Sequence, residues 1–374
     1  MIPPKRIDND RQKGNKTMRI AVLGHGVIGR HVCATIDSSA EHELKWILER
    51  PELATEPKMT GDVSEIMNDP TVELVCDILP GTHPSYEYMK MALEAGKHVV
   101  TVNKAALCFG FRELTELAES KGLCLRYEAA CGGTIPDIAE TLKLAQTNEI
   151  TAVYGIMNGT TNFIIDKMNR EGAEFEPTLR EAQRLGYAEA DPTADLSGFD
   201  VKNKIIIISN TAYKCCCTNE FPMCGIEHLT KDILDDFAAE GKTVKLFGLS
   251  VRRGDRYAIG VAPVVLPMDA LEAHVPANFN LFTLRADKAG EIKLYGQGAG
   301  GVPTADAVVR DIAAIAEAPA HRGGAYFSRP MVYDPSLLTG TGYLGGRKAH
   351  GTLEELCRQA LAEQAFLAFE PDEL

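Results

Sequence analysis

The glycine-rich segment Gly24–Gly29 constrains the fold more than any other stretch of this 374-residue chain. A run of strand-forming residues, Ile20 to Leu23, leads into the sequence Gly-His-Gly-Val-Ile-Gly, and a helical pattern follows directly. Glycines at these positions allow a tight turn, close approach of backbone N–H groups to a pyrophosphate, and close packing of a helix on a strand. The strand–turn–helix context favours dinucleotide binding over a turn without a phosphate ligand. The residues expected to hold the cofactor in this turn are Gly24, Gly26, Val27, Ile28 and Gly29.

Strands and helices alternate from this turn to about residue 150 with short connections. This alternation predicts an α/β architecture with a doubly wound parallel sheet of the Rossmann type. Ligands of such sheets bind at the carboxyl ends of the strands. Expected strands end at polar positions around Arg50, Thr82 and Asn103–Lys104. We therefore expect these residues beside the cofactor, and Lys104 in a functional position rather than as a solvated surface lysine.

The end of the second expected strand leaves the cofactor choice open. Glu49 lies 20 residues after Gly29, where an acidic residue would bind the ribose hydroxyls of NAD. The adjacent Arg50 would instead pair with the 2′-phosphate of NADP. The sequence therefore indicates NAD or NADP without deciding between them.

The second half of the chain has a different pattern. A strand and a helix flank the polar segment Asn158–Asn162, which is expected as a loop that suits a carboxylate-bearing ligand or caps the helix. Strand-type runs between residues 244 and 296 predict a largely antiparallel sheet, so this half is expected to be an α+β domain. A final amphipathic helix is expected over residues 352–369.

The segment Leu185–Lys204 carries several carboxylates and then runs into four consecutive isoleucines. A helix is expected from Gly198 onward, and on it Asp200 and Lys204 share one face because they are four residues apart. The pair is either an ordinary surface ion pair or a charged pair presented from the wall of the protein core. The segment Leu185–Lys204 alone does not distinguish these two kinds of ion pair.

Charge and hydrophobicity argue against nucleic-acid-binding and membrane-spanning classes of protein. The net charge of −13 argues against binding to nucleic acid or an anionic membrane, and no apolar run approaches the roughly 18 residues that span a bilayer. The N-terminal residues lack the apolar segment of a secretory signal, so the ten cysteines are expected to be reduced thiols in a cytoplasmic protein. Three consecutive thiols, Cys215 to Cys217, match no zinc spacing.

Six separated motifs give this chain a resemblance to homoserine dehydrogenases, from about Met18 to Ala320. They are the glycine turn, VTVNKAAL, YEAACGGTIP, GIMNGTTNFI, LGYAEADPTADLSGFDVKNK and YGQGAGGVPTADAVV. The resemblance implies reduction of L-aspartate 4-semialdehyde to L-homoserine with NAD(P)H, in the biosynthesis of threonine, methionine and isoleucine. It also implies a homodimer or higher homo-oligomer.

The resemblance implies a role for individual residues. Lys104 and Lys204 match the two active-site lysines, and Asp200 matches the aspartate one turn before the second. Glu189 and Asp195 match the acids that hold the substrate's amino group. Gly159, Thr160 and Gly298 match residues that line the cleft between the domains. Glu128 matches the residue around which some members bind a monovalent cation, Na⁺ or K⁺.

The same resemblance gives expected domain boundaries. They are a disordered lead (1–17), a dinucleotide-binding domain (18–150), a substrate-binding and dimerisation domain (151–300), a helix returning to the cofactor domain (301–320), and a C-terminal extension of unknown role (321–374). This extension is too short and too poorly patterned for the regulatory ACT domain of some members. We therefore expect no threonine feedback through such a domain.

Several positions depart from the family pattern. Thr134 and Asp137 replace a glycine and an apolar residue, and Asp77 and Pro80 stand where a glutamate and a glycine are usual. These departures affect the expected cation site and the cofactor preference. Thr134 and Asp137 motivate one alternative, a divergent enzyme that oxidises another small amino or hydroxy acid. A second alternative is a catalytically silent NAD(P)-binding regulator that kept the fold, and the intact Lys104, Glu189, Asp200 and Lys204 argue against it.

Overall fold

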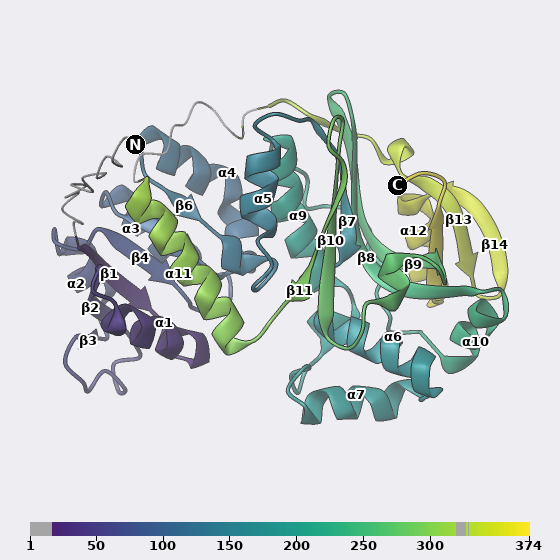
Figure 1. Ribbon diagram of the computed structural model, residues 1–374, viewed down its shortest axis with the longest axis horizontal. Coiled ribbons are helices and arrows are strands. Elements are labelled where there is room, and N and C mark those ends of the chain that lie inside the picture. Colours follow the sequence, from purple (N-terminus) through teal and green to yellow (C-terminus); the bar gives the residue numbers. More distant parts are fainter. Residues whose placement is uncertain (1–16, 319–326, 328) are drawn as a thin grey trace, which may run out of the picture.

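The computed structural model describes residues 17–318, 327 and 329–374, which form two β-sheets with helices packed on them (Figure 1). Residues 1–16, where a disordered lead was expected, lie outside the described residues. Within the described part of the chain, no helix combines the length and apolar character needed to cross a membrane.

The N-terminal sheet is entirely parallel. It has six strands in the order β3-β2-β1-β4-β5-β6. The strands are β1 (Met18–Leu23), β2 (His42–Leu48), β3 (Met59–Thr60), β4 (Leu74–Asp77), β5 (His98–Thr101) and β6 (Leu125–Arg126). This order is that of dinucleotide-binding doubly wound folds, so the expected Rossmann-type sheet is confirmed.

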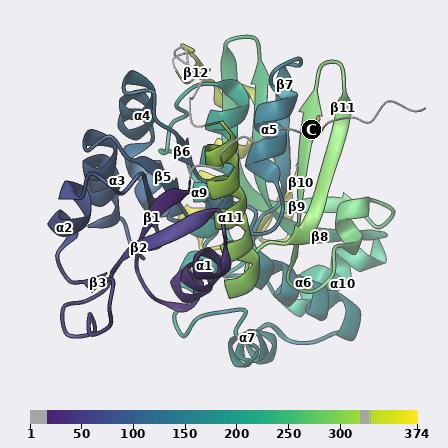
Figure 2. The same cartoon turned by 60° about the vertical axis from the view of Figure 1, so that its left-hand side comes forward.

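Helices cover both faces of this sheet, as the alternation of side chains along β1 requires. Ile20 and Val22 pack on one face with α1 (Val27–Ser38) and α11 (Gly301–Glu317). Ala21 and Leu23 point to the other face, towards α3 (Ser85–Glu94) and α4 (Lys104–Ser120). The short helix α2 (Val63–Asn68) precedes β4. Figure 2 shows α11 beside α1, although the two helices are far apart in the sequence.

The second sheet has nine strands and is mainly antiparallel. Its path is β11-β10-β7-β8-β9-β15-β13-β14, with β12 paired to β9. The strands up to β11 are β7 (Ile150–Ile156), β8 (Lys242–Arg253), β9 (Arg256–Pro267), β10 (Phe279–Ala286) and β11 (Gly290–Gln297). All pairs among these five are antiparallel, which confirms the expectation for this region.

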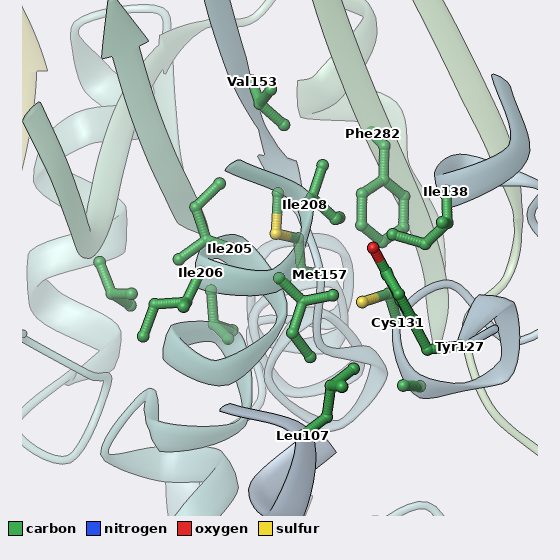
Figure 3. Packing of buried hydrophobic residues seen from close by; sticks show 14 of the residues in the cluster. Leu107, Tyr127, Cys131, Ile138, Val153, Met157, Ile205, Ile206, Ile208 and Phe282 are labelled. Carbon is green, nitrogen blue, oxygen red and sulfur yellow. The ribbon is translucent and has the colours of Figure 1, made fainter. Parts of the chain in front are cut away.

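The remaining helices before β8 are α5 (Asp137–Leu144), which precedes β7, and five helices between β7 and β8 in the sequence. These five are α6 (Gly159–Glu171), α7 (Phe175–Arg184), α8 (Thr193–Leu196), α9 (Phe199–Tyr213) and α10 (Lys231–Ala239). Helix α9 carries the four isoleucines, and Figure 3 shows Ile205 and Ile206 near Met157, with Leu107 of α4 close by. This continuous apolar core holds α9 against both α4 and the second sheet.

The C-terminal segment extends the second sheet. It forms β12 (Val332–Tyr333), β13 (Thr339–Leu344), β14 (Arg347–Thr352), α12 (Leu353–Glu363) and β15 (Leu367–Pro371). The helix expected over residues 352–369 is therefore wrong in its last part. The helix ends at Glu363, the next residue Gln364 adopts the left-handed conformation, and the strand that follows pairs with β9 and β13 instead. Strand pairing with distant segments outweighs the local helical pattern here.

Candidate active site

The Asp200 carboxylate lies between two lysine ammonium groups from different parts of the fold. Lys104 is the first residue of α4, and its Nζ lies 3.1 Å from Asp200 Oδ1. Lys204 is one turn after Asp200 on α9, and its Nζ lies 2.9 Å from Asp200 Oδ2. Lys204 is 6% exposed, so the pair is not a solvated surface ion pair. The structure brings together the three residues expected to be catalytic.

Electrostatics keep this cluster charged. Burial opposes ionisation of Asp200, but Lys104 and Lys204 outweigh that effect and hold the pKa of Asp200 below its usual value. The pKa of Lys104 is raised, chiefly by the charge of Asp200 and against the effect of burial. Lys204 Nζ also donates to the backbone carbonyl of Met157 at 2.7 Å, which fixes the ammonium at the end of β7.

Asn158 joins this cluster to a second carboxylate, and the sequence did not single it out as a site residue. Its Nδ2 donates to Asp195 Oδ1 at 2.7 Å and to Asp200 Oδ2 at 3.0 Å. Its Oδ1 caps α6 by accepting from the N–H of Thr161 at 2.8 Å. The loop expected over 158–162 is thus wrong beyond its first residue, because Asn158 is an N-cap and the helix begins at Gly159. A polar residue directly after a buried strand was the available signal.

Of the residues expected to bind substrate, Thr160 and Asp195 lie beside the charged cluster, whereas Glu189 does not contact it. Thr160 Oγ1 lies 3.0 Å from Asp195 Oδ2, and Asp195 has a raised pKa because of burial and the nearby charge of Asp200. Gly159 lies against the backbone of Asn278, where an added Cβ would meet the Asn278 carbonyl oxygen at 2.7 Å. Glu189 lies on the exposed loop between α7 and α8. The contacts that join the other residues do not involve its carboxylate.

The glycine turn fits a dinucleotide. Gly24 has a φ of +100°, and a Cβ there would meet the Ile78 carbonyl at 3.0 Å. A Cβ at Gly29 would meet the Gly24 carbonyl oxygen at 2.0 Å, so helix α1 can pack on β1 only with glycine there. A Cβ at Gly26 would meet nothing within 4 Å, and no side chain caps α1, which begins at Val27 and Ile28. The helix N-terminus is therefore accessible to a pyrophosphate.

The other expected cofactor residues lie at neighbouring strand ends. Glu49 and Arg50 follow β2 directly, and the N–H of Gly24 donates to the carbonyl of Leu48 at 3.0 Å. Arg50 is 72% exposed in its side chain, while that of Glu49 is 19% exposed. Both stand at the same edge of the sheet as the glycine turn. The acid that would bind the ribose of NAD and the arginine that would bind the 2′-phosphate of NADP are therefore both at the cofactor site.

Asn103 connects two of these strand ends. Its Nδ2 donates to the Leu79 carbonyl at 2.9 Å and the Gly81 carbonyl at 2.5 Å, and its Oδ1 caps α4. Thr82 comes next in the loop held by this side chain. Asn103 therefore fixes both the β4–α3 loop and the first turn of α4, which carries Lys104.

Asp77 is buried beneath this region. Its Oδ2 accepts hydrogen bonds from Ser85 Oγ at 2.6 Å and Thr101 Oγ1 at 2.8 Å. Thr101 Oγ1 in turn accepts from the N–H of Asn103 at 2.9 Å. Burial raises the pKa of Asp77 to about 6, and these two hydroxyl hydrogen bonds only partly oppose it. The sequence identified Asp77 as a departure from the family pattern but gave no sign of this network.

Two glycine-rich segments meet between the sheets. A Cβ at Gly133 would meet the Gly298 carbonyl carbon at 2.7 Å, and Thr134 Oγ1 donates to the Gln297 carbonyl at 3.1 Å. Arg310 on α11 donates to the Thr134 carbonyl at 3.0 Å. Thr134 therefore helps join the two segments, and Gly298 lies at this junction as expected for a residue between the domains.

The expected cation site contains an unusual pair of buried acids. The Glu128 carboxylate accepts from the N–H groups of Ile138 and Ala139 at 3.0 and 2.8 Å. Asp137 is fully buried, and burial together with the charge of Glu128 raises its pKa well above the usual value, so its protonated carboxyl group can share a hydrogen bond with Glu128. Two adjacent buried acids could hold a cation when ionised, although the described residues contain no group of three His, Cys, Asp or Glu side chains that could hold a metal. All ten cysteines are free thiols.

Comparisons with known proteins agree with one another. Residues 24–128 match the model of the homoserine dehydrogenase NAD binding domain, and residues 136–313 match the model of homoserine dehydrogenase. The homoserine dehydrogenase of Corynebacterium glutamicum is 34% identical over 326 residues, covering 82% of this chain and 73% of that protein. That of Bacillus subtilis is 32% identical and covers 80% of this chain and 73% of that protein.

Solved structures give the same result. A homoserine dehydrogenase from Thiobacillus denitrificans superposes with a TM-score of 0.81 at 31% identity, covering 87% of this chain and 82% of that one. The homoserine dehydrogenase of S. aureus at pH 7.5 superposes with a TM-score of 0.72 at 28% identity, covering 93% and 87%. The chain therefore has an NAD-binding domain and belongs to the homoserine dehydrogenase family, oxidoreductases that act on a CH–OH group with NAD(P).

Proposed function

We propose that Lys204 is the proton donor when this chain interconverts L-homoserine and L-aspartate 4-semialdehyde. Hydride arriving at the aldehyde carbon creates an alkoxide, which needs an ammonium within hydrogen-bond reach. The contacts of Lys204 with Asp200 and the Met157 carbonyl use two of its three N–H groups. The third is then left for the substrate oxygen. The placement of Asp200 between two ammonium groups is the observation that carries this proposal.

Lys104 orients the substrate carbonyl in this scheme. It starts α4 beside the Asn103 cap, and its side chain is 36% exposed, so it can face the space between cofactor and substrate. Asp200 keeps it protonated, since the carboxylate raises its pKa. Lys104 therefore stays a hydrogen-bond donor at neutral pH and does not act as a base.

The carboxylates near α6 bind the substrate's α-ammonium group. Asp195 is held by Asn158 and Thr160, so its oxygens are fixed in direction. A cationic ligand would favour its ionised form despite burial. Glu189 on the exposed loop is proposed as the second partner, and reaches the ammonium when the loop lies over the bound substrate.

The glycine turn and the neighbouring strand ends hold NAD or NADP. When bound, the nicotinamide supplies or accepts the hydride. Gly24, Gly26 and Gly29 admit the pyrophosphate to the N-terminus of α1, where Val27 and Ile28 begin the helix. Thr82, Asn103 and Gly298 would help to hold the cofactor from the other strand ends and the junction of the two segments. Glu49 or Arg50 would bind the adenosine ribose and would thereby set the preference between NAD and NADP.

We propose a homodimer or higher homo-oligomer that works in the cytoplasm, in the pathway to threonine, methionine and isoleucine. Ten free thiols are in keeping with a reducing compartment. Glu128 and Asp137 would hold a Na⁺ or K⁺ ion, whose charge would favour the ionised form of both buried acids.

Steady-state kinetics test the function. The purified protein should oxidise L-homoserine far faster than L-serine, L-threonine or other small hydroxy acids, and the same assay with NAD⁺ and NADP⁺ should reveal the preferred cofactor. Faster turnover of another alcohol would favour the divergent enzyme. Binding of cofactor without turnover of any member of the panel would favour the silent regulator.

A further inference from the structure

A cationic pocket lies away from the active site, at the C-terminal ends of α5 and α9. Its volume is about 300 Å³. Four cationic side chains line it: Lys214 after α9, Arg252 on β8, Lys288 in the β10–β11 turn, and Arg329. Lys214 is ten residues beyond Lys204, roughly 15 Å along a helix. The pocket is therefore separate from the site proposed for catalysis.

The two arginines converge on one exposed carboxylate. The side chain of Arg252 is only 4% exposed, and its Nη2 lies 3.1 Å from Glu149 Oε1. Arg329 Nη1 lies 3.6 Å from the same oxygen, while the Glu149 side chain is 61% exposed. Burying a guanidinium is costly unless it is paired, and a solvent-exposed carboxylate is a weak partner. A ligand with more oxyanion charge would satisfy both arginines better.

Two of the four cationic side chains in the pocket have a structural role at the end of helix α5. Lys214 Nζ donates to the Ala145 carbonyl at 3.0 Å and Lys288 Nζ to the Thr147 carbonyl at 2.7 Å, so both lysines neutralise the C-terminal end of α5. Arg252 Nε instead donates to the Gly254 carbonyl at 2.9 Å, away from that helix end. Glu149 is the one carboxylate among the described lining residues, and Asp287 accepts from its N–H at the rim. Four cations against one lining carboxylate contrast with the net charge of −13 of the chain.

We propose that this pocket binds a small multivalent oxyanion, bearing phosphate or carboxylate groups. Guanidinium groups match such oxyanions by parallel charge-assisted hydrogen bonds, and the lysines add point charges at the rim. The ligand displaces the exposed Glu149 carboxylate from Arg252 and Arg329. This proposal is independent of the catalytic roles given to Lys104, Asp200 and Lys204.

Isothermal titration calorimetry on the full chain tests it, with inorganic pyrophosphate and citrate as separate probes at constant ionic strength. We expect saturable binding of at least one probe, and the stronger probe identifies the oxyanion class. The double variant Arg329→Gln with Lys288→Gln should raise the Kd at least about tenfold, because charge-assisted hydrogen bonds are lost. Both positions are exposed, so the variant should keep the wild-type fold, which circular dichroism checks.

The matched control removes the same charges elsewhere. Arg347→Gln with Lys348→Gln alters two exposed cations on β14, and should leave the Kd as in wild type. Absence of saturable binding of both probes by the wild-type protein overturns the proposal. So does an unchanged Kd in the pocket variant, which would place the ligand in the cofactor turn, or an equal loss in the control, which would indicate unspecific attraction.

Discussion

Asp77 and Asp200 are two buried aspartates with opposite protonation behaviour. Asp77 accepts hydrogen bonds from two hydroxyl groups, and burial raises its pKa to about 6. Asp200 is contacted by two ammonium groups, which lower its pKa in spite of burial. Burial is common to both, so the charge of the partners decides whether the pKa of the carboxyl group is raised or lowered. Asp200 has an electrostatic role, whereas Asp77 organises the strand ends through hydrogen bonds that a neutral side chain can also accept.

The largest effect is expected for Lys204→Ala. Turnover should fall by about 10³-fold or more, because the transition-state alkoxide loses its ammonium. The affinity for NAD(P)H should stay nearly unchanged when measured by fluorescence titration. Lys202→Ala is the control on the same helix, since Lys202 lies over the rings of Phe199 and Phe221 and not beside Asp200. Near-wild-type turnover in the Lys204 variant would refute the assignment.

Asp200→Asn should come next. It keeps the shape of the side chain but removes the charge between the two lysines, so turnover should drop by about 10²-fold with a smaller change in KM. Asp77→Asn should cost far less turnover, because the hydroxyl partners do not require a charge. Comparable losses in the two variants would mean that the distinction between these aspartates has no catalytic meaning.

Stability against pH should separate the same two residues. The pKa of Asp77 is raised in the folded state, so its contribution to the free energy of unfolding is full below about pH 4 and is lost as the pH rises through 6. The shift from 3.8 to about 6 corresponds to roughly 3 kcal/mol. Asp77→Asn should flatten the decline in the free energy of unfolding of the wild-type protein between about pH 4 and pH 6, as measured by urea unfolding.

Asp200→Asn should act in the opposite sense in the same experiment. Its pKa is lowered in the folded state, so its stabilisation is present at neutral pH and is lost only as the pH falls through that lowered value. The variant should therefore be less stable than wild type at pH 8. Parallel pH profiles for both variants would contradict the comparison.

Glu189→Ala tests a carboxylate outside the buried clusters. The apparent KM for L-homoserine should rise by about tenfold, the scale expected for one charge-assisted contact to the substrate, while kcat changes little. Glu181→Ala, a nearby acid that pairs with Lys167, is the control and should leave KM unchanged. A fall in kcat without a change in KM would argue against substrate binding by Glu189.

The smallest effect is expected from monovalent cations. Replacing KCl and NaCl by tetramethylammonium chloride should lower activity if an ion bound at Glu128 and Asp137 supports the junction of the two domains. Asp137→Asn should abolish the difference between the salts. Equal activity of the wild-type protein in all three salts would remove the cation from the proposal.

Features that depend on local spacing could be predicted from the order of the residues. The glycine turn and the Asp200–Lys204 pair each depend on residues within one or two helical turns of each other. The alternation of strands and helices is a succession of such local patterns. The antiparallel character of β7 to β11 could be predicted for the same reason, because apolar runs and turn residues mark each strand.

Contacts between segments that are distant in sequence could not be predicted and depend on how the elements pack. Lys104 meets Asp200 because α4 packs on α9, and the distance of 3.1 Å depends on a core built from both domains. The two bonds of Asn158, the network of Asp77 and the strand β15 at the end of the chain likewise depend on neighbours far away in sequence. Local patterns fix periodicity and turns, but they do not specify which buried polar groups meet, because that is set by how the whole core packs.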